Sequence, residues 1–104
     1  MKKILSLSTI AVAVVLLSLP VAAEDASVEL GKKLFNNPGL GASQNAISCN
    51  TCHPDGIGLE KAGGNPNLAA VINQCITGPL SGEKINEETV AMQSLKLYIQ
   101  SLKQ

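Results

Sequence analysis

The chain has 104 residues, with eight lysines, no arginine and eight acidic residues, so its formal net charge is zero. Two of the lysines occupy positions 2 and 3, so six lysines face eight acids in the remainder of the chain. Binding to a nucleic-acid backbone relies on an excess of positive charge. The composition therefore disfavours nucleic acid as a partner.

The first 23 residues have the pattern of an export signal. Lys2 and Lys3 precede an apolar stretch at 4–19, and small residues follow at 20–23. This order is typical of a cleaved secretory signal peptide, so we predict a signal at 1–23 and a single domain at 24–104. The apolar stretch is nearly long enough to span a bilayer, which leaves an uncleaved anchor as the alternative. Once the signal is cleaved, we expect no stable membrane insertion.

The first helix of the domain is predicted after Ser27. A serine here suits a helix N-cap, and Leu30, Leu34 and Phe35 fall on one helical face. Pro38 and the following glycine end the helix.

Cys49, Cys52 and His53 form a C-x-x-C-H motif. The segment before it, 40–48, is small and polar and is predicted to be a loop or a short turn. In such a motif two thiols bond a haem covalently and the imidazole binds its iron. We therefore predict one covalently bound haem c, attached through Cys49 and Cys52, with His53 as the proximal axial ligand.

Two other uses of these residues are weaker. Cys49, Cys52, His53 and Cys75 supply enough ligands for zinc, but Cys52 and His53 are adjacent, whereas structural zinc sites normally separate such ligands. A thioredoxin-like dithiol belongs to a βαβ pattern, and no run of strand patterns is present in the sequence. Haem attachment therefore remains the prediction.

Two further helices are predicted after the motif. The segment 54–66 contains four glycines and no hydrophobic period, so we expect a loop over the haem edge. A helix is predicted over 67–77, ending at Gly78. Asn86 is the expected N-cap of the last helix. Apolar residues repeat along that helix at Met92, Leu95, Ile99 and Leu102.

This order of helices around C-x-x-C-H resembles that of the small class I bacterial cytochromes c. The resemblance implies an all-α fold with about three helices and long loops around one covalently bound haem. In those proteins the first and last helices cross through a small residue and aromatic residues. Gly31 and Phe35 match one side of such a crossing, and Leu95 and Tyr98 match the other.

Two narrower resemblances are local. Residues 31–40, followed by 48–53, are similar to the opening of di-haem cytochrome c peroxidases, although the second haem motif is absent. Residues 72–75, followed by 92–99, are similar to sulfur-compound-oxidising cytochromes such as thiosulfate dehydrogenase, where the matching cysteine ligates haem. That second match is short and lacks most of the substrate loop of that enzyme.

The sixth iron ligand is left open by the sequence. His53 is the only histidine, so the candidates are Met92, Cys75, a lysine or no protein ligand. Met92 lies 39 residues after His53, a separation typical of class I cytochromes with a methionine ligand. It also lies on an apolar helical stripe, where methionine ordinarily fills the core. Cys75 is the one thiol not used by the haem, and its alternative role is that of a buried small hydrophobe.

The predicted function is that of a periplasmic mono-haem electron carrier that exchanges single electrons with redox protein partners. We expect an electron carrier rather than an enzyme, because the sequence offers no second haem motif and no evident distal base. The alternative is a haem subunit or enzyme that oxidises an inorganic sulfur compound, with Cys75 at the haem.

Overall fold

The computed structural model describes residues 25–102, and the predicted signal segment at 1–23 lies outside them. Within this range the protein is all-α, and no strand is formed. Helices α1 (Val28–Phe35), α2 (Cys49–Cys52), α3 (Leu68–Thr77) and α4 (Val90–Gln100) are joined by loops that contain three short 3₁₀ turns. The predicted all-α cytochrome-like fold is confirmed. None of the helices between residues 25 and 102 has the length and apolarity needed to cross a membrane.

Helix α1 begins as its sequence predicts. Ser27 has extended backbone angles, and its hydroxyl accepts a hydrogen bond of 3.0 Å from the Leu30 amide. This bond satisfies one of the amides that lack a partner at a helix N-terminus. The Ser27 amide donates in turn to the Ser94 hydroxyl on α4, at 3.1 Å. The start of α1 is therefore fixed to α4.

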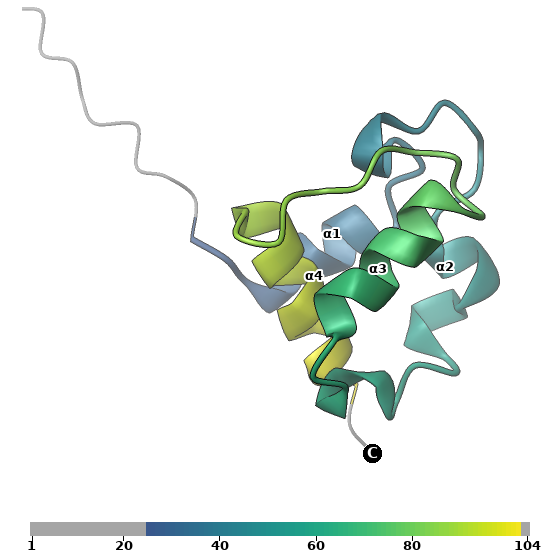
Figure 1. The fold of residues 1–104 in the computed structure, drawn as a ribbon. Coiled ribbons are helices and arrows are strands. Elements are labelled where there is room, and N and C mark those ends of the chain that lie inside the picture. Colours follow the sequence, from purple (N-terminus) through teal and green to yellow (C-terminus); the bar gives the residue numbers. More distant parts are fainter. Residues whose placement is uncertain (1–24, 103–104) are drawn as a thin grey trace, which may run out of the picture.

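Helices α1 and α4 cross in close contact, and α3 also contacts α4 (Figure 1). Gly31 lies at the crossing, where a Cβ atom would overlap the Ser94 carbonyl and come within 2.7 Å of the Tyr98 Cβ. Beside it the rings of Phe35 and Tyr98 pack with centroids 5.0 Å apart and planes tilted by 60°. The predicted crossing through a glycine and two aromatic residues is confirmed.

The start of α4 differs from the prediction. Thr89, not Asn86, is the N-cap, and its hydroxyl accepts a 3.2 Å hydrogen bond from the Met92 amide. The Asn86 side chain instead accepts from the Glu88 amide at 2.9 Å, which closes a local turn before the helix. Asparagine suits such turns as well as it suits helix caps, so the residue type alone did not distinguish the two.

The loop between α3 and α4 is fastened to α3 by one side chain. The side-chain nitrogen of Asn73 donates a hydrogen bond to the Ile85 carbonyl at 2.9 Å. The side-chain oxygen of Asn73 accepts one from the backbone amide of Ile85 at 2.8 Å. Ser43, from the segment before α2, donates its hydroxyl to the Leu80 carbonyl in the same loop. These contacts hold the loop and α3 as one wall of the molecule.

Candidate haem site

The motif predicted to bind haem is itself helical. Cys49–Cys52 form the single-turn helix α2, and the hydroxyl of Thr51 accepts a 3.0 Å hydrogen bond from the Ser48 amide ahead of it. Asn50, between the two cysteines, accepts a 2.8 Å hydrogen bond from the Asp55 amide. The residues between the motif cysteines therefore stabilise the turns on both sides, while the cysteine side chains remain available.

The orientation of His53 is set by the turn that follows it. Its Nδ1 atom lies 3.0 Å from the Ile57 carbonyl oxygen. Because a carbonyl only accepts, Nδ1 must carry the proton in this hydrogen bond, which leaves Nε2 with a free lone pair. Gly58 lies against the ring, since a Cβ at this position would come within 3.3 Å of Nδ1. A ligating histidine commonly has its second nitrogen fixed in this way.

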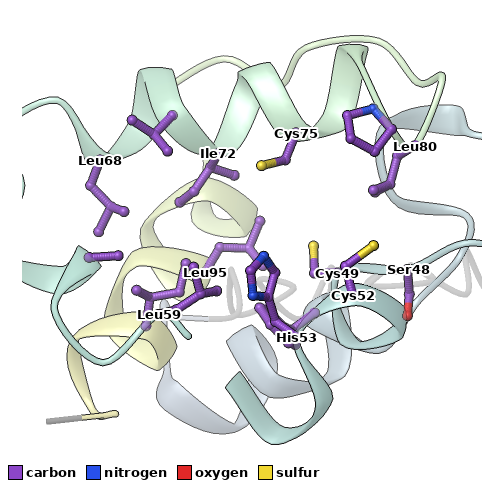
Figure 2. Close-up of a pocket in the computed structure, with 15 residues that line it drawn as sticks. Ser48, Cys49, Cys52, His53, Leu59, Leu68, Ile72, Cys75, Leu80 and Leu95 are labelled. Carbon is purple, nitrogen blue, oxygen red and sulfur yellow. The ribbon is translucent and has the colours of Figure 1, made fainter. Parts of the chain in front are cut away.

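An apolar cavity of about 90 Å³ lies between α2 and α3. Figure 2 shows Cys49, Cys52 and His53 on one side of this space and α3 on the other. The remaining wall is almost entirely aliphatic and includes Leu59, Leu68, Ile72, Leu80 and Leu95. A largely apolar lining with a few polar side chains on one side is typical of a site for a cofactor or another largely apolar ligand.

The three thiols face this cavity together. Burial raises the pKa of the Cys49 thiol to about 11, and the nearby Cys75 adds to the increase. Burial also raises the pKa of Cys75, with Cys52 as the second cause. Without a bound group, Cys49 and Cys75 are therefore neutral thiols at neutral pH.

The two candidates for a distal ligand lie in different places. Cys75, on α3, lines the cavity, and its sulfur faces the space above the His53 ring (Figure 2). Met92, in the first turn of α4, is fully buried in the hydrophobic core and does not line the cavity. The structure thus brings Cys49, Cys52, His53 and Cys75 together and leaves Met92 apart.

The thiols and the imidazole do not converge on one point. Among residues 25–102, no three histidine, cysteine, aspartate or glutamate side chains are close enough to hold a single metal ion. The side chains are instead spread around the apolar cavity. That spread suits a flat ligand with several attachment points better than a compact tetrahedral ion.

Some contributors to the site were not foreseen. The Ile57 carbonyl orients His53 through its backbone, so its side chain carries no signal of this role. The positive φ angles of Gly56 (82°) and Gly58 (94°) allow the turn that brings this carbonyl back to the ring. Two glycines spaced by one residue, beginning three positions after His53, are the sequence feature that could have revealed it.

Comparison with known proteins gives one match. A protein-family model described as di-haem cytochrome c peroxidase matches residues 25–101. The chain belongs to this family. The match covers all four helices, and it supports a haem-binding c-type cytochrome domain. Neither a curated protein nor a solved structure matches the chain.

The cytochrome c peroxidase family is named for enzymes with two haems, whereas this sequence contains one C-x-x-C-H motif. The residues present fit one haem. Two thiols are available on α2, one imidazole nitrogen is free, and the surrounding space is apolar. The expected similarity to the opening of this family therefore extends over the whole domain.

Proposed function

We propose that the protein is a mono-haem c-type cytochrome that transfers single electrons between redox proteins in the periplasm. In this proposal Cys49 and Cys52 hold one haem covalently and His53 is its proximal ligand. The observation that carries the proposal is the apolar cavity whose one side bears two thiols and an imidazole with its Nε2 free. The bound haem supplies one-electron chemistry.

The protein's own residues have three tasks in this function. Cys49 and Cys52 fix the position of the group, so that it stays attached during exchange with partners. The hydrogen bond from His53 to the Ile57 carbonyl holds the imidazole in one tautomer and strengthens it as a ligand. The aliphatic wall would shield much of the bound group from water, which limits the reorganisation that accompanies a change of charge.

An electron carrier is favoured over a peroxidase by the composition of the cavity wall. Cleavage of peroxide requires a group that moves protons on the distal side. Within the described chain, the wall contains no carboxylate, no side-chain amide and no second imidazole. Apart from the side chains of Cys49, Cys52 and His53, its polar side chains are the thiol of Cys75 and the hydroxyl of Ser48.

A test of this proposal starts from the protein produced in cells competent in cytochrome c maturation. The wild-type protein should carry one haem that remains attached after denaturation, and it should exchange electrons reversibly in a redox titration. Cys49→Ser with Cys52→Ser should abolish covalent attachment, whereas Ser81→Ala, an exposed residue in the loop after α3, should not. Hydrogen peroxide turnover by the wild-type protein at the rate of an enzyme would overturn the assignment as a carrier.

One observation favours a second function, oxidation of an inorganic sulfur compound at the haem. Cys75 lies in the cavity, where its sulfur could take part in such a reaction. The two functions differ in what reduces the protein. If the protein oxidises thiosulfate repeatedly when an artificial electron acceptor reoxidises the haem, and Cys75→Ala removes this activity, the sulfur-oxidising function replaces the carrier. A pure carrier accepts electrons from a protein or a mediator and is inert toward thiosulfate.

A further inference from the structure

We propose that the sulfur of Cys75 is the sixth ligand of the haem iron, on the side opposite His53. This inference rests on the proposed haem attachment and names the distal ligand of that same site. It follows from which potential ligands the fold places on the cavity wall. Apart from the three motif residues, Cys75 supplies the only strong iron ligand on the described wall.

Met92 is removed from the cavity by the packing of α4. Its side chain is fully buried in the hydrophobic core, and its amide is bonded to the Thr89 hydroxyl that caps the helix. Bringing its thioether into the cavity would unwind the first turn of α4, break the cap and empty a filled part of the core. Cys75 needs no such rearrangement.

The lysines do not compete for this position either. None of those in the described chain lines the cavity. Lys84 instead borders surface hollows on the other side of α3, together with Asn73 and Glu87. Ligation by Lys84 would therefore require the loop after α3 to leave the contacts that Asn73 makes with Ile85.

The rotation of α3 about its axis directs Cys75 into the cavity. Leu68, Ile72 and Cys75 are spaced by four and three residues, so they share one helical face. All three line the cavity. Asn73 faces the opposite way and binds the loop through two hydrogen bonds. The loop thus holds α3 through Asn73, on the face away from the cavity. On the opposite face, the Cys75 sulfur points into the cavity toward His53 (Figure 2).

Ligation by Cys75 has a defined chemistry. The S–H bond breaks, the proton passes to solvent, and a bond between sulfur and iron forms without a change in the oxidation state of iron. A thiolate donates electron density and so favours the ferric form, which lowers the reduction potential. With both axial positions filled by protein, small external ligands are kept from the iron. This last property suits a carrier that does not turn over peroxide.

The test compares three variants of the haem-loaded protein. Cys75→Ala removes the proposed ligand, Cys75→Met replaces it with a neutral sulfur, and Met92→Leu is the matched control in the core. Each is analysed by mass, far-UV circular dichroism, ferric electron paramagnetic resonance and redox titration. Carbon monoxide binding to the ferrous form reports whether the sixth position is open.

We expect a low-spin ferric wild-type protein. Cys75→Ala should lose this low-spin signal, shift the midpoint potential upward and bind carbon monoxide readily. Cys75→Met, which also serves if the alanine variant does not fold, should show a changed low-spin signal and a raised potential. Met92→Leu should keep the wild-type spectrum and potential.

Unchanged spectra and potential in haem-loaded Cys75→Ala would overturn the inference, and so would loss of the low-spin signal in folded Met92→Leu. In both cases the haem is still attached, so the proposed function survives. A wild-type protein without covalent haem would instead remove the proposed function and this inference together.

Discussion

The α1–α4 crossing and the cavity between α2 and α3 are two parts of one small core, and they are completed in different ways. At the crossing, Ser94 and Tyr98 are buried, and Gly31 allows direct contact between the helices. At the cavity, the wall is aliphatic, yet Cys52 and Cys75 remain exposed. The chain fills the first region with its own side chains. The second region is shaped for a group that the polypeptide does not supply.

This difference predicts a strong dependence of folding on the haem. A domain of this size has little apolar surface to bury unaided, and an apolar cavity lies between α2 and α3. We expect the protein produced without haem attachment to have lower helicity and no cooperative thermal transition, as measured by far-UV circular dichroism. The haem-loaded protein is the control. Equal cooperativity in the two forms would show that the cavity is not a missing part of the core.

The crossing should be sensitive to a single methyl group. Gly31→Ala places a Cβ against the Ser94 carbonyl and the Tyr98 side chain, and overpacking of this kind costs about 3 kcal/mol at the upper end of its usual range. This outweighs the roughly 0.5–1 kcal/mol that alanine gains over glycine inside a helix. Denaturant unfolding of the haem-loaded protein measures the loss.

Gly64→Ala is the matched control for that change, because nothing lies within 4 Å of a Cβ at position 64. We expect its free energy of unfolding to stay close to that of the wild-type protein. The haem spectrum should be the same in both variants. A Gly31→Ala protein as stable as the wild type would mean that the helices are not in contact here.

The wall opposite the motif depends on the two hydrogen bonds between Asn73 and Ile85. Asn73→Ala leaves both backbone groups of Ile85 without this partner, which should cost about 1–2 kcal/mol of stability. Asn73→Asp keeps the acceptor for the Ile85 amide but loses the donor, so an intermediate loss is expected. Hydrogen exchange of the Ile85 amide checks the local effect, since its protection should fall in Asn73→Ala. Unchanged protection would contradict the role of Asn73 in holding the loop.

The smallest expected effect is a pH dependence at the crossing. Burial, and then the negative charge of Asp55, raises the pKa of Tyr98. The unfolded chain therefore loses this proton at lower pH than the folded protein does. The stability that Tyr98 contributes is present below its unfolded pKa of about 10 and is lost as pH rises through the folded pKa. Urea midpoints measured from pH 8 upward should fall more steeply in the wild-type protein than in Tyr98→Phe, and parallel slopes would contradict this.

The sequence predicted the features that depend on local chemistry. The Ser27 cap follows from a serine before an amphipathic helix. The close contact at Gly31 was implied by the resemblance to class I cytochromes c. The N-cap of α4 was wrongly placed because Asn86 can close a turn as readily as it can cap a helix. The choice between Met92 and Cys75 depended on how α3 and α4 are rotated in the folded protein. Both residues lie on apolar helical stripes, so periodicity alone did not separate them.

The most direct test of the central claim is the mass of the protein purified under denaturing conditions from cells competent in cytochrome c maturation. We predict a mass equal to the polypeptide plus one haem, with the red colour remaining on the unfolded chain and localised by peptide mapping to Cys49 and Cys52. A folded, colourless protein with the mass of the polypeptide alone would contradict the claim that the cavity between α2 and α3 is a haem site.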